Sequence, residues 1–163
     1  KSKKIITAAN KFRGLKFRQE IVHSNKKITI INDSKATSFA SSINILKSLN
    51  RVLWLVGGVS KLGDKFTLSK KECKNICAYI YGKKKNFFIK QFKNKLQYYC
   101  FKNLNNALGQ ALIDIKNDNV HKTILFSPSA ASFDSFKNFE ERGNYFNSLL
   151  KNYKFKQKLN VNK

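Results

Sequence analysis

The stretch VLWLVGG, residues 52–58, is a continuous apolar run that ends at two glycines. A run of this length is typical of a β-strand buried on both faces, and such strands occur mainly in parallel sheets covered by helices. Gly57 and Gly58 indicate a tight turn directly after the strand. The sequence therefore predicts a buried parallel strand here, followed by a turn.

The segments around this run alternate between strand-like and helix-like patterns. A helical pattern begins at Ser38, after the polar turn that follows Asn32, with Thr37 or Ser38 as its N-cap. Strands are expected at 17–23 and 27–32, joined by a short hairpin connection, and at 76–82, 96–100 and 121–126; helices are expected at 67–74, 85–93 and 103–116. This alternation predicts an α/β fold, a Rossmann-like, doubly wound and mostly parallel sheet with an N-terminal β-hairpin at its edge.

The length and the cysteines of the chain favour one ordinary domain. The 163 residues can bury a substantial core without disulfides. No stretch has the roughly 20 apolar residues of a membrane span and no signal peptide is visible, so we expect a cytoplasmic protein. Cys73, Cys77 and Cys100 are odd in number and lack zinc-site spacing. Reduced, partly buried thiols are expected rather than a metal site.

The net charge of +24 raises the question of a polyanionic partner. Of the 33 basic residues, only Arg13, Arg18, Arg51 and Arg142 are arginines, whereas nucleic-acid surfaces favour arginine. The lysines are spread along the whole chain and are accompanied by abundant Asn, Ile and Phe. This mixture is expected when a coding sequence drifts toward A and T, and the lysines would then lie mainly on solvated faces. A basic nucleic-acid-binding α/β module is kept as the alternative, and it predicts binding with a steep salt dependence.

Three of the expected strands are followed by polar and small residues of similar character. NDSKAT (32–37), GGVSKLGDKF (57–66) and SPSAASFDSF (127–136) each combine residues that let backbone N–H groups approach a ligand with hydroxyls or an ammonium. In open α/β sheets, ligands bind beyond the carboxyl ends of the strands. We therefore expect these three segments to converge on an anion.

Several residues in these segments can be interpreted either as purely structural or as binding a ligand. Lys35, beside hydroxyls and a carboxylate, favours a phosphate or carboxylate contact over a surface role. Asp33 suits a turn, a nucleotide ribose or a metal-bound water equally well. Lys61 follows the two glycines and suits a small acidic ligand. Ser132 matches a helix N-cap, which is also an anion site.

The remaining charged residues and the two histidines form no recognisable catalytic arrangement in the sequence. Lys137 and Glu141 are expected to pair on a solvated helix face that also carries Asp134, Glu140 and Arg142. His23 and His121 have no visible catalytic partner. We therefore expect neither histidine to be catalytic.

Four motifs together resemble a known family. GLKFRQE (14–20), NDSKAT, GGVSKLGDKF and SPSAASFDSFKNFEERG (127–143) are similar to motifs in the C-terminal domain of the Mur ligases, of the type that adds D-glutamate. Residues 67–120 carry no such signature. The chain has Lys16 and Phe17 where the family has Pro and His, and Ser129 or Ala130 where the family has Cys. The motifs argue against a folylpolyglutamate-type ligase of the same superfamily.

The resemblance implies an ATP-dependent amide ligase of peptidoglycan biosynthesis, which serves cell shape and division. A monomeric, cytoplasmic enzyme would join D-glutamate to UDP-N-acetylmuramoyl-L-alanine through an acyl phosphate. ATP and Mg²⁺ would be bound mainly by a central domain, and the uridine nucleotide by an N-terminal domain, both outside this chain. Residues 1–16 would be the linker from the central domain, 17–154 the acceptor-binding domain and 155–163 a frayed tail. The isolated domain would be inactive.

The resemblance also implies roles for single residues. Arg18 would reach the ATP phosphates and Asp33 would contact the nucleotide. No catalytic residue and no metal ligand is assigned to this part of the enzyme. The D-glutamate contacts would come from Lys35, Thr37, Lys61, Ser132, the backbone at Phe133 and the ring of Phe139.

Overall fold

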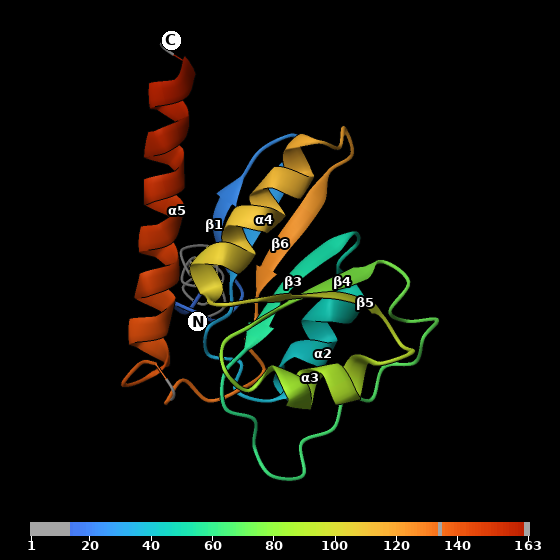
Figure 1. Ribbon diagram of the computed structural model, residues 1–163. Coiled ribbons are helices and arrows are strands. Elements are labelled where there is room, and N and C mark those ends of the chain that lie inside the picture. The colour runs from blue at the N-terminus through green and yellow to red at the C-terminus, as the bar shows by residue number, and fades with distance from the viewer. Residues whose placement is uncertain (1–13, 134, 162–163) are drawn as a thin grey trace, which may run out of the picture.

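A single mixed sheet organises the chain, which a computed structural model describes over residues 14–133 and 135–161 (Figure 1). The strands run in the order β1-β2-β6-β3-β4-β5. β1 is antiparallel to β2, and every other neighbouring pair is parallel. The strands are β1 (Glu20–Ser24), β2 (Ile28–Asn32), β3 (Val52–Gly57), β4 (Ile76–Tyr81), β5 (Gln97–Phe101) and β6 (Lys122–Phe126). The predicted fold class, with its hairpin edge, is confirmed.

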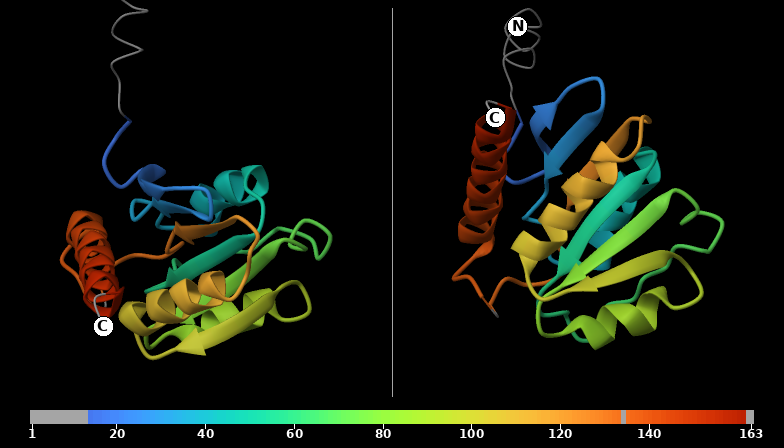
Figure 2. Two further views of the ribbon diagram at one scale, coloured as in Figure 1. Left: turned by 90° about the horizontal axis from the view of Figure 1, so that it is seen from above. Right: turned by 45° about the horizontal axis from the view of Figure 1, so that its top comes forward.

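Helices cover both faces of the sheet, as the alternating side chains of β3 require. Val52, Trp54 and Val56 belong to the core under α2 (Phe39–Ser48) and α3 (Lys85–Phe92). Leu53 and Leu55 belong to the opposite core, under α4 (Leu104–Lys116) and α5 (Phe139–Val161). Figure 2 shows α5 standing beside α4 along one side of the sheet. Because both faces are covered, β3 is apolar throughout.

The core under α2 and α3 is built mainly from aromatic rings. Phe39 lies 5.4 Å from Phe66 between ring centroids, and Trp54 lies 5.2 Å from Phe92. Trp54 is fully buried, and its indole N–H donates to the carbonyl of Ser127 at 2.7 Å. A buried indole N–H requires such a partner. This bond therefore ties the aromatic core to the loop that follows β6.

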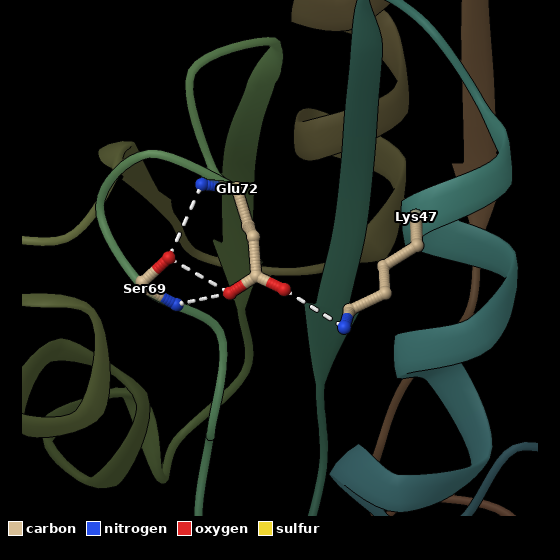
Figure 3. A network of polar contacts seen from close by, with 3 residues as sticks. All are labelled: Lys47, Ser69 and Glu72. Carbon is tan, nitrogen blue, oxygen red and sulfur yellow. Dashed lines mark hydrogen bonds and ion pairs between the residues drawn. The ribbon is translucent and has the colours of Figure 1, made fainter.

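The connection between β3 and β4 contains no helix, so the predicted helix at 67–74 is wrong. Residues 70–75 form hydrogen-bonded turns that lead directly into β4. The Glu72 carboxylate accepts from the backbone N–H and the hydroxyl of Ser69 and pairs with Lys47 of α2 at 2.8 Å (Figure 3). Because β4 begins at Ile76, the turn has no room to propagate into a helix.

The helix after β6 begins later than its sequence suggested. Ser132 is not its N-cap: α5 begins at Phe139, and the side chain of Asn138 accepts from the backbone N–H of Glu141 at 2.8 Å. α5 continues to Val161, so the segment expected to fray is helical as far as that residue. Residues 1–13 of the expected linker lie outside the described residues.

Other local predictions can be compared directly with the structure. Ser38 is the N-cap of α2, as expected. All three cysteines are free, Cys73 being buried, Cys77 half-buried and Cys100 exposed; burial raises the pKa of Cys73 and of Cys77 to about 11. No helix in the described part of the chain is long and apolar enough to cross a membrane.

Candidate functional site

The three polar segments meet at one edge of the sheet because β6 lies between β2 and β3. The backbone N–H of Asp33 donates to the carbonyl of Phe126 at 2.7 Å, joining the ends of β2 and β6. On the other side, Val59 and Ala131 form an isolated antiparallel bridge. The three segments therefore meet, as expected, at the edge to which the strands of Figure 1 lead; that they bind an anion there stays a prediction.

Gly57 and Gly58 allow the backbone to come unusually close at this edge. A Cβ atom on Gly57 would lie 2.3 Å from the carbonyl oxygen of Tyr81, and one on Gly58 would lie 2.6 Å from that of Ala131. The φ angle of Gly58 is +125°, which side chains other than hydrogen rarely allow. These glycines thus bring the loop after β3 against its neighbours.

Arg142 of α5 holds two of the three segments together. The side chain is 1% exposed, and its guanidinium donates to the carbonyl of Ser34 at 2.7 Å and to the carbonyl of Ala130 at 2.9 Å. Its Nε also donates to the hydroxyl of Ser34 at 3.2 Å, and that hydroxyl donates to the carbonyl of Phe139 at 2.8 Å. The sequence had placed Arg142 on a solvated face, and that expectation is wrong.

A chain of buried hydroxyls runs from Asp33 into α2. Ser127 donates to the Asp33 carboxylate at 2.8 Å. The Ser42 hydroxyl lies 2.6 Å from those of Ser127 and Ser129. Since each hydroxyl has one hydrogen, the donation to Asp33 fixes the direction: Ser42 donates to Ser127, and Ser129 donates to Ser42. Asp33 is therefore the terminal acceptor of a network that links three elements.

Asp33 is buried at the centre of the edge, and its carboxylate is engaged by the chain itself. It is 4% exposed and also accepts from the backbone N–H of Gln19 at 3.1 Å. Burial raises the pKa of Asp33, while the bonds from Ser127 and Gln19 and the nearby charge of Arg18 act against that rise. Arg18 is exposed beside it. The two residues expected on the nucleotide side thus come from adjacent segments.

The segment before β1 is fixed to the same edge by Phe17, one of the departures from the family motif. Phe17 is 5% exposed and has a φ angle of +60°. Its backbone N–H donates to the Glu20 carboxylate at 3.0 Å, and its carbonyl accepts from the backbone N–H of Lys35 at 3.0 Å. Its ring lies so close to α5 that a Cβ atom on Gly143 would overlap it at 2.3 Å.

The side chains expected to bind an acidic ligand border this edge from several loops. The Lys35 ammonium lies over the Phe139 ring, 5.2 Å from its centroid, and both side chains remain accessible. Lys61 is exposed two residues beyond the Val59–Ala131 bridge, and Ser132, 3% exposed, lies one residue beyond it. The structure thus brings Lys35 to Phe139 and the segment of Lys61 to that of Ser132.

For two of the residues expected to bind the acidic ligand, Thr37 and Phe133, the described part of the chain shows no hydrogen bond, ion pair or ring contact from the side chain to the rest of that set. Thr37 is half-buried next to the N-cap of α2, and the ring of Phe133 is 78% exposed. Among the described residues, no hydrogen bond or ion pair joins the side chain of Thr37 or Lys61 to another member of this set. No group of three or more His, Cys, Asp or Glu side chains gathers within the described residues.

Comparison with known proteins identifies relatives of the chain. No model of a known protein family matches it. The UDP-N-acetylmuramoylalanine–D-glutamate ligase of Rickettsia felis is 39% identical over 153 residues, which is 93% of this chain and 34% of that ligase. The chain is homologous to one segment of such ligases. Two further ligases of the same name support this, from Wolbachia pipientis wMel (36% identity, 94% of the chain, 30% of the ligase) and Prochlorococcus marinus (34%, 98% and 34%).

The ligase homology confirms the resemblance found in the motifs and extends it. The chain spans about a third of the length of the curated ligases it matches. Because the match covers at least nine-tenths of the chain in these three ligases, it includes most of residues 67–120, where no motif had been recognised. The ligase relationship therefore applies to the whole fold rather than to its loops alone.

Sequence reasoning missed three residues that build the ligase-like edge. Arg142 and Ser42 act through buried hydrogen bonds, and Asp64 accepts from the backbone N–H of Phe39 at 2.9 Å in the first turn of α2. Asp64 and Arg142 stand inside the quoted motifs, which was the available signal for them. Ser42 stands in an ordinary helical pattern and gave no signal.

Proposed function

We propose that this chain is the C-terminal, acceptor-binding domain of an ATP-dependent ligase that adds D-glutamate to UDP-N-acetylmuramoyl-L-alanine in cytoplasmic peptidoglycan synthesis. The observation that carries the proposal is the homology, at 34–39% identity over nearly the whole chain, to ligases of that name. The convergence of NDSKAT, GGVSKLGDKF and SPSAASFDSF at one sheet edge supports it, because the motifs that resemble the family are the ones that meet.

The chemistry of the edge suits a dicarboxylate such as D-glutamate. The ammonium groups of Lys35 and Lys61 are exposed, so that each can form a charge-assisted hydrogen bond with a carboxylate. Thr37 and Ser132 supply hydroxyls, and the backbone at Phe133 supplies a further donor. The Phe139 ring, which already contacts the Lys35 ammonium, closes one side. We assign these six residues to D-glutamate.

The nucleotide is assigned to the side of the edge where Arg18 and Asp33 lie. The exposed guanidinium of Arg18 suits the phosphates of ATP. The buried carboxylate of Asp33 holds the Gln19 and Ser127 segments in place. We assign its remaining lone pairs to the nucleotide. Mg²⁺ and most of the ATP contacts would come from a central domain outside this chain.

The reaction requires both halves of such an enzyme. The carboxylate of UDP-N-acetylmuramoyl-L-alanine attacks the γ-phosphorus of ATP, giving an acyl phosphate and ADP; the D-glutamate amine then displaces phosphate and forms the amide. In this scheme the present chain binds and orients the amine, and catalysis arises mainly from positioning. Since activation of the carboxylate needs the other domains, this chain alone is expected to show no turnover.

Phosphate release by the intact ligase that carries this chain tests the proposal. The assay contains ATP, Mg²⁺ and UDP-N-acetylmuramoyl-L-alanine and compares D-glutamate with L-glutamate, L-lysine and diaminopimelate. We expect release with D-glutamate alone. Lys35→Ala and Lys61→Ala should each lower kcat/KM for D-glutamate by about 100-fold, the effect of losing a charged substrate contact of roughly 2–3 kcal/mol.

The matched control is Lys116→Ala, which removes an exposed lysine at the C-terminal end of α4. It should leave kcat/KM within about twofold of the unchanged enzyme, because surface charges far from a site contribute little. Release with a different amino acid would refute the proposed acceptor. Equal losses in all three variants would refute the assignment of Lys35 and Lys61.

A further inference from the structure

A cleft opens at the ends of β3, β4 and β5, on the side of the sheet where the candidate site lies. Its volume is about 870 Å³, within the range of small-molecule sites. The register pairs Gly57 with Tyr81 and Tyr81 with Phe101, so the three strands end side by side. The residues that follow them, including Gly58, Gly82 and Lys102, line the cleft. None of the roles proposed above uses this cleft.

One wall of the cleft is strongly cationic. Lys83 and Lys85 follow β4, and Lys102 follows β5. Lys83 and Lys102 are exposed, while the Lys85 ammonium lies 3.5 Å from the carbonyl of Phe101. Among the described residues, which do not include Asp134, no carboxylate forms an ion pair with any of the three. α4 begins at this wall with Asn103 and Leu104, which adds the positive end of a 13-residue helix.

A second part of the lining is aromatic. Phe136, from the loop after β6, and Tyr145 of α5 both line the cleft, and their ring centroids lie 5.3 Å apart. Tyr145 is 40% exposed, so its ring is accessible to a ligand. Aromatic side chains of this kind stack on planar bases, and clustered lysines bind phosphates. The two parts of the lining together match a molecule with a planar ring at one end and phosphates at the other.

A lysine-lined groove elsewhere on the molecule lacks this combination. Lys70, Lys71, Lys74 and Lys95 border a groove near the starts of β4 and β5. Lys95 is already engaged, because its ammonium donates to the carbonyl of Phe66 at 2.8 Å and lies over the Phe66 ring. That groove has no aromatic lining residue. It therefore serves as an internal reference for what surface lysines alone can bind.

We propose that the cleft beyond β3, β4 and β5 is a binding site for a nucleoside phosphate, with Lys83 and Lys102 holding the phosphates and Phe136 and Tyr145 contacting the base. The site is separate from the acceptor and nucleotide positions assigned above and does not rest on them. It lies mainly on residues from the part of the chain that carried no recognisable motif.

Isothermal titration calorimetry of this 163-residue chain with ADP, UDP and inorganic pyrophosphate, at 150 mM salt, tests the proposal. The chain alone is used, without acceptor amino acid, so the result is independent of ligase turnover. We expect binding of at least one nucleotide. Lys83→Gln with Lys102→Gln should weaken nucleotide and pyrophosphate binding by about tenfold or more, because two charge-assisted contacts are lost.

Three further variants make the test discriminating. Lys70→Gln with Lys74→Gln removes the same charge from the reference groove and should change the Kd by less than about twofold. Phe136→Ala should weaken nucleotide binding while leaving pyrophosphate binding unchanged. Arg51→Gln removes an exposed arginine directly before β3, at the other end of that strand from the cleft, and should change the Kd by less than about twofold. Circular dichroism on each variant verifies that the fold is retained.

Several outcomes would overturn the proposal. Absence of nucleotide binding at millimolar concentration would do so directly. Equal weakening by the two double lysine variants would show attraction by the overall charge only. Unchanged nucleotide binding in Lys83→Gln/Lys102→Gln would show that the nucleotide binds elsewhere on the chain. If the Kd for nucleotides is unchanged in Phe136→Ala, the base does not bind in the cleft at Phe136.

Discussion

The guanidinium of Arg142 donates to the carbonyl of Ser34 across 108 positions of sequence, at a distance of 2.7 Å. The same guanidinium donates to the carbonyl of Ala130. A single buried side chain thus fixes the loop after β2 against the loop after β6. The geometry of the candidate site depends on this connection, because both loops carry residues assigned to D-glutamate.

Replacing Arg142 should therefore be costly. Arg142→Met keeps the apolar stem but leaves two buried carbonyls without their donors, which should lower the free energy of unfolding by about 3 kcal/mol. Arg51→Met removes an exposed arginine and should cost less than about 0.5 kcal/mol. Urea unfolding followed by circular dichroism measures both. Similar costs in the two variants would contradict a connecting role for Arg142.

The hydroxyl chain predicts a specific weak point in α2. Ser42→Ala removes the donor to Ser127 and the acceptor of Ser129, both of which are buried. The expected loss is about 2 kcal/mol of unfolding free energy. Ser148→Ala, on the exposed side of α5, is the matched control and should be nearly neutral. If Ser42→Ala is equally neutral in urea unfolding, the network does not contribute to stability.

The two glycines Gly58 and Gly63 should respond differently to an added methyl group. In Gly58→Ala the Cβ atom would lie 2.6 Å from the carbonyl oxygen of Ala131, a backbone atom that has to shift to accommodate it. We expect a loss of about 3 kcal/mol, from the collision and the positive φ together. Gly63 has a φ angle of +75° with nothing within 4 Å, so Gly63→Ala should cost only about 1 kcal/mol. Thermal unfolding of both variants would reveal the difference.

The Ser69–Glu72–Lys47 contact predicts a pH dependence of stability. The ion pair with Lys47, aided by Ser69, lowers the pKa of Glu72 from 4.5 to about 2. The folded chain therefore binds this proton less readily than the unfolded chain. The contribution is fully present above pH 4.5 and is lost as the pH falls toward 2.

Glu72→Gln should flatten the stability profile in that window. Urea midpoints measured at intervals between pH 5 and pH 2 should fall less steeply for Glu72→Gln than for the unchanged chain. Lys47→Met, which leaves the Ser69 bonds in place, should give an intermediate slope. Parallel profiles for all three proteins would show that the contact of Figure 3 does not persist in solution.

Local sequence patterns predicted the sheet well because the residues of strands such as β3 indicate directly that the strand is buried. Val52–Val56 is apolar on both sides of the strand, and only a covered parallel sheet accommodates that. The position of the site followed from the strand ends, since ligands gather where parallel strands terminate.

The remaining features depended on contacts between distant segments. Arg142 binds backbone carbonyls, and the residue types that carry those carbonyls give no hint of the contact. The neighbouring Lys137–Glu141 spacing therefore suggested only a solvated face. The turn at Ser69 and Glu72 has the composition of a helix start, but the following strand leaves it no length. The segment around Ser132 resembles an N-cap, yet Asn138 performs that role because the chain first has to cross from β6 to α5.

The position of β6 has a consequence for how the chain acquires its shape during synthesis. Of the six described strands, β6 is the last in the sequence, yet it lies between β2 and β3 and pairs with both. Until residue 126 has been translated, those two strands have no common partner and present unpaired edges. Closing so long a stretch of chain is slow, and exposed edges invite association with other chains. Until β6 has emerged, a nascent chain of this sequence is therefore prone to associate with other chains through these strand edges.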